Sequence, residues 1–389
     1  MTSEKHTVED FLPEHEGRFK YVRQYWVDYS GVLRARFIPI DRCLRIAEGT
    51  ENYHLAQGSM IIPISTAPKV LSLGDRHETW ELVPDWSSLR PCGSNHDHAT
   101  VMCSLYEKGS SEKCPRKLLE GVLGEFRISF NSTFLLGFEI QFMLLDPSGE
   151  VHKPMDRLNG SFRTAGLRTE MLDIMDEILQ ALRTSNIPIQ HFNTGLADQL
   201  KISLIPETPL EAIDSLILAQ VTIRTICLRH NLRATMAPKP LLNGPFNCVD
   251  LHLSTQSFHP EYADNFLAGI LAHVRSLCAF GLANFDSYVR AVNGYAGESL
   301  VSGQTTVTSQ RARNSPDLPE TSQRTAHGLT VKMPGSLQEA LDHLKEDSVM
   351  RDILSRNFLN CYTPLKEKEV EEFAKMTEEE RRLRFLKYF

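Results

Sequence analysis

Alternating apolar and polar positions open the chain and predict a pair of strands. Residues 19–40 read FKYVRQYWVDYSGVLRARFIPI, which we interpret as two strands joined by a turn at Asp28–Gly31. A short helix is predicted next, at IDRCLRIAEG, and residues 79–106 then alternate again. These elements predict a small mixed α+β domain over residues 15–112.

From residue 113 the pattern changes to longer helices separated by short strands. An apolar strand is predicted at TFLLGFEIQFMLLD, residues 133–146, and another at QLKISLI, residues 199–205. Apolar residues at helical spacing and acidic residues near helix starts predict helices over 168–186, 209–231 and 261–282. The pattern therefore predicts a larger α+β domain over residues 113–389.

One stretch of this second domain has no periodicity at all. Residues 304–328 read QTTVTSQRARNSPDLPETSQRTAHG, which is rich in Ser, Thr, Arg and Pro and poor in apolar residues. Such a composition predicts an irregular or disordered segment. A structureless segment of this length is unusual inside a compact domain.

Composition and charge narrow the class of protein. A formal net charge of -7, with no basic stripe, argues against a nucleic-acid-binding protein. The polar N-terminus resembles no signal or transit peptide, and no apolar stretch reaches membrane-spanning length. The eight scattered cysteines form no CxxC pair, which is typical of reduced, buried thiols. We therefore expect a cytoplasmic protein with no membrane and no nucleic-acid partner.

Two predicted strands carry pairs of polar residues on one face. Glu139 and Gln141 interrupt the apolar run GFEIQF, and Asp250 and His252 lie two residues apart in VDLHLS. Side chains two apart in a strand point the same way, so each pair shares a face. By spacing alone, ordinary structural roles are favoured over a metal or catalytic role for both pairs.

The order of motifs along the chain resembles a known family. The series GFEIQF, IPIQHFNTGLADQLKISLIP, LRHNLRATMAPKP, NGPFNCVDLHLS and NFDSYVRAVNGY is similar to the catalytic domain of type I glutamine synthetases. The series most resembles the branch found in fungal developmental proteins of the FluG kind. YWVDYSGVLRARFIP and LVPDWSSLRP resemble that family's N-terminal β-grasp domain, and residues 334–373 resemble its closing helices.

The resemblance implies a fold, a reaction and cofactors. It implies a curved antiparallel sheet backed by the three helices predicted above, in a chain that assembles into homo-oligomeric rings. The family uses ATP to phosphorylate the side-chain carboxylate of glutamate or a related acid, and ammonia or an amine then displaces the phosphate. Mg²⁺ or Mn²⁺ must neutralise the triphosphate, so oxygen ligands from several strands are required.

The metal-ligand positions are degraded in this chain. The family motif GFExEF carries two metal-binding acids; Glu139 matches the first, and Gln141 replaces the second. Asp250 matches a metal-binding His, a change that an Mg²⁺ or Mn²⁺ site tolerates. In TGLADQLK, Thr194 and Lys201 replace two further acids. We expect Lys201 to occupy the place of the metal and to pair with Glu139.

Other positions match nucleotide- and substrate-binding residues of the family. The resemblance assigns Arg290 to the substrate carboxylate, a role that suits its bidentate guanidinium. By the same resemblance, the nucleotide-binding residues are His252, Ser254 and Lys239, and the substrate-binding residues are Asn243, Gly244 and Arg290. The arginines, the metal-binding Glu and the Asn-Pro-Tyr motif expected downstream are absent, and residues 304–328 stand in their place.

These matches leave two main hypotheses and a weaker third. The first is an ATP- and Mg²⁺-dependent ligase joining ammonia or an amine to glutamate or a related acid. The second is a catalytically silent homologue that keeps the fold and acts as a binding or oligomer-forming subunit. The third is a fragmentary product whose deletion exposes apolar sheet edges. Repulsion between the Lys201 ammonium and a bound metal ion would cost on the order of several kcal/mol, and this cost disfavours the usual two-metal mechanism.

Overall fold

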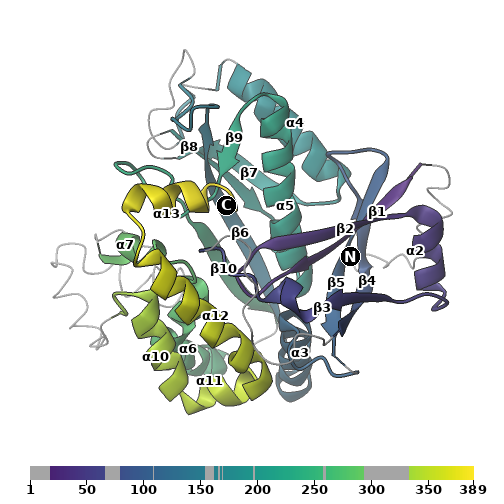
Figure 1. Cartoon of the computed structure of the whole chain (residues 1–389), viewed down its shortest axis with the longest axis vertical. Helices are drawn as coiled ribbons and strands as arrows, with labels where there is room; N and C mark the ends of the chain where they lie inside the picture. The colour runs from purple at the N-terminus through teal and green to yellow at the C-terminus, as the bar shows by residue number, and fades with distance from the viewer. Residues whose placement is uncertain are drawn as a thin grey trace. The chain divides into compact units, whose positions relative to one another are not determined.

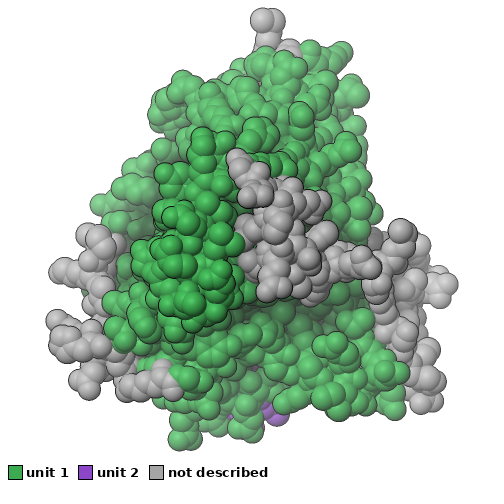
Figure 2. Space-filling view, turned by 90° about the vertical axis from the view of Figure 1, so that its right-hand side faces the viewer, with its two compact units in different colours: residues 1–263, 351–389 green, residues 264–350 purple. Residues whose placement is uncertain are grey.

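The structure is a computed structural model whose helices and strands are drawn in Figure 1, and its chain divides into two units. It describes residues 18–65, 79–107, 109–153, 162–164, 167–168, 170–195, 198–256, 260–292 and 333–389. Unit 1 comprises residues 1–263 and 351–389, and unit 2 comprises residues 264–350 (Figure 2). The irregular segment predicted at 304–328 lies outside the described residues, and the domain boundary predicted near residue 112 stays a prediction.

The first sheet of unit 1 is built from the N-terminal strands in the order β2-β1-β5-β4-β3. Its strands are β1 (Tyr21–Val27), β2 (Leu33–Pro39), β3 (Tyr53–Ala56), β4 (Thr79–Pro91) and β5 (His98–Tyr106), and α2 (Ile40–Ala47) follows β2. The predicted turn joins β1 to β2, and in it Gly31 adopts a φ of 83°, which glycine reaches without steric cost. The Asp28 carboxylate accepts hydrogen bonds from the backbone N–H groups of Ser30 and Val32, which fixes this turn.

The second sheet of unit 1 is antiparallel and runs in the order β10-β6-β8-β7, with the short strand β9 also paired to β6. Its strands are β6 (Thr133–Leu145), β7 (Ile189–Thr194), β8 (Gln199–Leu204), β9 (Arg233–Thr235) and β10 (Val249–Gln256). The long apolar strand predicted at 133–146 is therefore confirmed as the central strand β6. Its length allows β6 to pair with three other strands.

Helices cover the apolar face of this sheet. They are α3 (Pro115–Phe130), α4 (Glu170–Thr184) and α5 (Pro209–Arg229), so the helices predicted at 168–186 and 209–231 are confirmed. Ile140, Phe142 and Ile202 of the sheet join Ile178 of α4 and Ile223 of α5 in one buried core. Because side chains alternate along a strand, burying these residues turns the intervening polar residues to the opposite face.

The remaining helices belong to the second half of the chain. They are α6 (Pro260–Gly281), α7 (Ser287–Val292), α10 (Leu337–Glu346), α11 (Ser348–Ile353), α12 (Arg356–Phe373) and α13 (Glu378–Phe385). The helix predicted at 261–282 forms as α6, most of which belongs to unit 2, and its role in backing the sheet stays a prediction. Within unit 2, His273 and Ser276 of α6 both bind the Asp347 carboxylate, at 2.7 and 2.8 Å.

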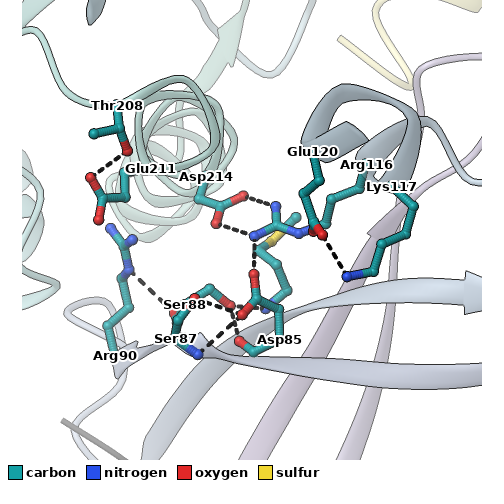
Figure 3. A network of polar contacts seen from close by, with 11 residues as sticks. Asp85, Ser87, Ser88, Arg90, Arg116, Lys117, Glu120, Thr208, Glu211 and Asp214 are labelled. Atoms are coloured by element: carbon teal, nitrogen blue, oxygen red, sulfur yellow. Dashed lines mark hydrogen bonds and ion pairs between the residues drawn. The ribbon is translucent and has the colours of Figure 1, made fainter. Parts of the chain in front are cut away.

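Two buried ion-pair networks fix the N-terminal sheet to the rest of unit 1. In the first, Arg116 of α3 binds both carboxylate oxygens of Asp214 on α5, at 2.5 and 2.9 Å, and also Asp85 of β4, at 2.6 Å (Figure 3). In the second, Lys366 of α12 pairs with Glu369 at 2.9 Å. The free oxygen of Glu369 accepts hydrogen bonds from the Ser30 hydroxyl and the Ile64 N–H. Both networks join residues that lie far apart in the sequence, so they connect elements that are not linked by strand pairing or by hydrogen bonds within a helix.

Candidate functional site

Polar side chains from four strands share one face of the second sheet. Directly opposed residues of antiparallel strands point to the same side, so the register decides which side chains meet. Asp250, Glu139, Ser203 and His191 form one row across β10, β6, β8 and β7, and Gln141, Lys201 and Asn193 form the next row. We call these seven residues the polar face.

The Glu139 carboxylate is the centre of the first row. Lys201 Nζ lies 2.6 Å from one of its oxygens, and the Ser203 hydroxyl donates to the other at 3.1 Å. The Ser203 oxygen lies in turn 3.2 Å from His191 Nε2. The ion pair expected from the sequence is thus present, and both oxygens of the only acid kept from GFExEF are already bound by protein groups.

The charge on Glu139 is stabilised by these neighbours. Burial alone raises the pKa of the Glu139 carboxyl, but the hydrogen bond and charge of Lys201, the Ser203 hydroxyl and the nearby His252 outweigh burial and lower this pKa below its usual range. Glu139 is therefore ionised, and its counter-charge comes from the protein itself.

Gln141 of the second row binds the Asp250 carboxylate of the first row. Its side-chain amide donates to the Asp250 carboxylate at 3.2 Å, and the Cys248 thiol donates to the other Asp250 oxygen at 3.0 Å. A carboxylate at position 141 would repel Asp250 unless a cation lay between them, whereas the amide binds it directly. Gln141 is buried, so this hydrogen bond also satisfies a donor that has little access to water.

The polar face does not fit a pair of divalent cations. Two carboxylates remain, Glu139 and Asp250, and the Lys201 ammonium lies against the first. In the part of the chain that the structure describes, no three His, Cys, Asp or Glu side chains are placed to hold a metal ion. Mg²⁺ and Mn²⁺ require several oxygen ligands, and this set offers too few.

Thr194, which replaces a family acid, and Gln199 of the same segment both make structural hydrogen bonds. The Thr194 hydroxyl accepts from the Arg163 N–H at 3.0 Å and donates to the Arg163 carbonyl at 3.1 Å. Gln199 donates to the Phe246 carbonyl at 2.8 Å and to the Asn247 side chain at 2.9 Å. Both side chains therefore tie strand ends to neighbouring loops.

The remaining residues assigned by resemblance lie at separate places. His252 and Ser254 are exposed on β10, on the same side as Asp250. The Lys239 ammonium is paired with Glu378 of α13. Asn243 and Gly244 are exposed in the loop before β10, and Arg290 belongs to α7 of unit 2, with its side chain outside the described residues. The roles assigned to these residues stay predictions.

Ser203, His191 and Asn193 belong to the polar face but were missed in the sequence. The period of two in QLKISL places Ser203 beside Lys201 and could have revealed it. His191 and Asn193 required the register of β7 with β8, which is irregular between Ile189 and His191. The buried Asn193 Oδ1 has no hydrogen-bond partner among the described residues.

Comparison with known proteins gives the family. The catalytic domain of glutamine synthetase matches the chain at residues 112–304 and 301–384. This match covers more than half of the chain, and the chain therefore belongs to the glutamine synthetase family.

Individual relatives agree with this placement. Protein fluG of Emericella nidulans is 27% identical over 96% of this chain and 49% of its own length. The glutamine synthetase of Methanocaldococcus jannaschii is 30% identical over 55% of this chain and 52% of its own length. The chain thus spans about half the length of the curated relatives it matches. The fluG alignment runs over 439 positions, more than the 389 residues of the chain, so it includes positions that this chain lacks.

A solved structure supports the fold as a whole. A crystal structure of a glutamine synthase homologue superposes with a TM-score of 0.77 at 18% identity, covering 95% of this chain and 99% of that one. The predicted α+β fold of the glutamine synthetase type is confirmed. In addition, no helix among the described residues is both long and apolar enough to cross a membrane.

Proposed function

We propose that this chain is a catalytically silent member of the glutamine synthetase family that serves as a binding or oligomer-forming subunit. The observation that carries the proposal is the Lys201–Glu139 ion pair of 2.6 Å. Lys201 supplies a fixed positive charge where the family's chemistry requires an exchangeable divalent cation. A cation that entered beside Glu139 would face the Lys201 ammonium, at a cost on the order of several kcal/mol.

Gln141 and Asp250 support the same conclusion. A metal site that has merely lost its ion keeps a cluster of mutually repelling carboxylates, which raises their pKa values. Here the Gln141 amide and the Cys248 thiol already satisfy both oxygens of Asp250, so the polar face is stable without a cation. Relative to the family motif, Gln141 and Lys201 each stand in place of an acid. Each also binds one of the acids that remain: Gln141 binds Asp250, and Lys201 binds Glu139.

A second candidate is a ligase with a reduced metal requirement, acting on glutamate or a related acid with ammonia or an amine. It is favoured by the register of β6 with β10, which places Glu139 directly opposite Asp250, so that two ionisable carboxylates share one face beside His252. ATP and Mg²⁺ or Mn²⁺ would be its cofactors by family membership. Supporting such a reaction would require Lys201 to swing away from Glu139 when the nucleotide binds.

Release of inorganic phosphate from ATP distinguishes the two candidates. The purified chain is incubated with ATP, Mg²⁺ or Mn²⁺, glutamate, and ammonia or one of a series of primary amines. The glutamine synthetase of Methanocaldococcus jannaschii serves as the positive control. We expect no phosphate release that depends on glutamate and amine. Release that requires both, and that is lost in Glu139→Gln, would establish the ligase instead.

A further inference from the structure

A small cavity opens in unit 1 between α3 and the irregular part of β4. The register of β4 with β5 shifts between Asp85 and Arg90, where four residues of β4 lie opposite Val101 of β5 alone. A bulge of this kind bends the strand away from regular pairing and makes room beside it. The cavity has a volume of about 300 Å³, and its described lining comes from β4, β5 and α3, all of unit 1. This volume lies at the lower end of the range for small-molecule sites.

The wall of this cavity contains a buried hydroxyl group that is not hydrogen-bonded. The Ser104 side chain lines the cavity from β5 and is 2% exposed, and its Oγ has no hydrogen-bond partner among the described residues. Buried polar atoms are normally paired, so an unpaired one in a cavity wall indicates a place for a polar group of a bound molecule. A serine hydroxyl can both donate and accept, so Ser104 can bind a group of either kind.

The cavity wall also carries an ion pair that can open at little cost. Lys117 and Glu120 lie one turn apart on α3, and the Lys117 Nζ is 2.6 Å from a Glu120 oxygen (Figure 3). Their side chains are 27% and 30% exposed, and an accessible pair of this kind contributes little to stability. Asp85 lines the cavity too, but Arg116 and Ser87 already bind its oxygens. The cavity therefore offers a ligand one available charge of each sign.

We propose that this cavity binds a free α-amino acid with a short apolar side chain. The carboxylate of the amino acid pairs with Lys117 and its ammonium group with Glu120, while the Ser104 hydroxyl donates to the carboxylate. Lys117 and Glu120 thus exchange each other for the ligand, and neither charge is left without a partner. A ligand with a single charge would leave one of the two uncompensated.

The rest of the wall determines which side chain the amino acid carries. Val83, Pro84 and Trp86 give the cavity an apolar surface, which favours an apolar side chain. Glutamate would bring its side-chain carboxylate beside that of Asp85 and should bind much more weakly. The cavity shares no residue with the polar face. The proposal is thus independent of whether the polar face is silent or active, and the phosphate assay above does not test it.

Calorimetric titration of the full chain with L-alanine, L-valine and L-leucine in turn tests the ligand class. We expect saturable binding of at least one of the three, together with a rise in the thermal unfolding temperature. The amine and the carboxylic acid with the same side chain each lack one of the two charges, and both should bind at least about tenfold more weakly. Absence of binding by all three amino acids, or equal binding by either analogue, would overturn the proposal.

Substitutions in the wall test the location of the site. Lys117→Met and Ser104→Ala should each weaken binding at least about tenfold. Ser104→Ala removes an unpaired buried hydroxyl, so we expect this variant to fold at least as well as the wild type, which circular dichroism checks. Lys368→Met is the matched control, because Lys368 forms a similar pair with Glu371 three residues further along α12, and it should leave binding unchanged. Binding that survives both wall substitutions would place the amino acid elsewhere and contradict the proposal.

Discussion

The Arg116 network and the Lys201–Glu139 pair of unit 1 each join a basic side chain to an acid, and they differ in how completely the acid is enclosed. Asp214 is only 2% exposed at its side chain, and Arg116 binds both of its oxygens while also reaching Asp85. The Glu139 side chain is 19% exposed, and the single ammonium of Lys201 binds one of its oxygens. Arginine presents a planar fork that fits a carboxylate, whereas lysine is a compact point charge.

This difference distinguishes a structural cross-link from an ion pair that, in our proposal, takes the place of a metal ion. The Arg116 network joins α3, α5 and β4, three elements that unit 1 must hold together (Figure 3). The Lys201 pair lies between adjacent strands that backbone hydrogen bonds already hold. Losing Arg116 should therefore damage the fold, whereas losing Lys201 should mainly change what the polar face binds.

The largest effect is expected for Arg116→Met. It leaves the Asp214 carboxylate buried without a partner, which should lower the free energy of unfolding by about 3–5 kcal/mol. Urea unfolding followed by circular dichroism measures this loss. Arg45→Met is the control, because Arg45 is half exposed in its pair with Glu51, and it should cost less than about 1 kcal/mol. Similar losses of unfolding free energy in Arg116→Met and Arg45→Met would contradict the greater structural importance of the buried network.

A gain of metal binding is expected when the polar face is restored. The double variant Gln141→Glu with Lys201→Glu groups four carboxylates, so it should be less stable than wild type without metal and should bind Mn²⁺ at least about tenfold more tightly. Thermal unfolding with and without Mn²⁺ reports both effects. Gln190→Glu with Lys387→Glu makes the same change in charge at exposed positions of unit 1 and should gain nothing. Unchanged Mn²⁺ binding in the first variant would refute the assignment of these positions.

The pKa of Glu139 should respond to Lys201 in a defined direction. In the wild type this pKa lies below its usual value, so the ionised pair stabilises the fold above the ordinary glutamate range and that stability is lost as the pH falls through the lowered pKa. In Lys201→Met burial remains without its counter-charge, and the Glu139 pKa should rise. Carbon NMR of labelled glutamate carboxyls, with Glu139→Gln to assign the signal, measures the shift. An unchanged pKa would mean that the ion pair does not form.

The smallest effect is a difference in thiol reactivity. Burial raises the pKa of Cys43 and Cys227 to about 12 and that of Cys278 to about 11, so these thiols are rarely ionised near neutral pH. Cys248 is the one cysteine among the described residues that is not buried, so iodoacetamide should reach it first at pH 8, even though the Asp250 carboxylate that accepts from its thiol disfavours the thiolate. Peptide mass spectrometry identifies the labelled residue, and Cys248→Ser removes the fast phase. Faster labelling of Cys43 or Cys227 would contradict the packing described here.

Most of the fold was predictable because its signals are local. The period of two in β6 and the helical periods of α4 and α5 follow from which residues must be buried. The resemblance to the family motif put Lys201 at a metal-ligand position and so predicted its ion pair with Glu139, which the structure contains.

What sequence could not supply was contact over long separations. Nothing near Asp214 in the chain indicates Arg116, since the two meet only when α3 and α5 pack together. His191 joined the polar face through a strand register that includes an irregularity, and an irregularity of this kind shifts every later side chain. Local periodicity therefore defines elements, and tertiary packing defines which of their polar residues meet.

Calorimetric titration of the purified chain with ATP in excess Mg²⁺, with and without glutamate, tests the central claim most directly. In our proposal Lys201 and Gln141 take the place of the cation on the polar face, and we therefore predict no binding heat from a folded sample under either condition. Binding of ATP that tightens when glutamate is present would contradict it, and would show a working ligase site in spite of the lost metal ligands.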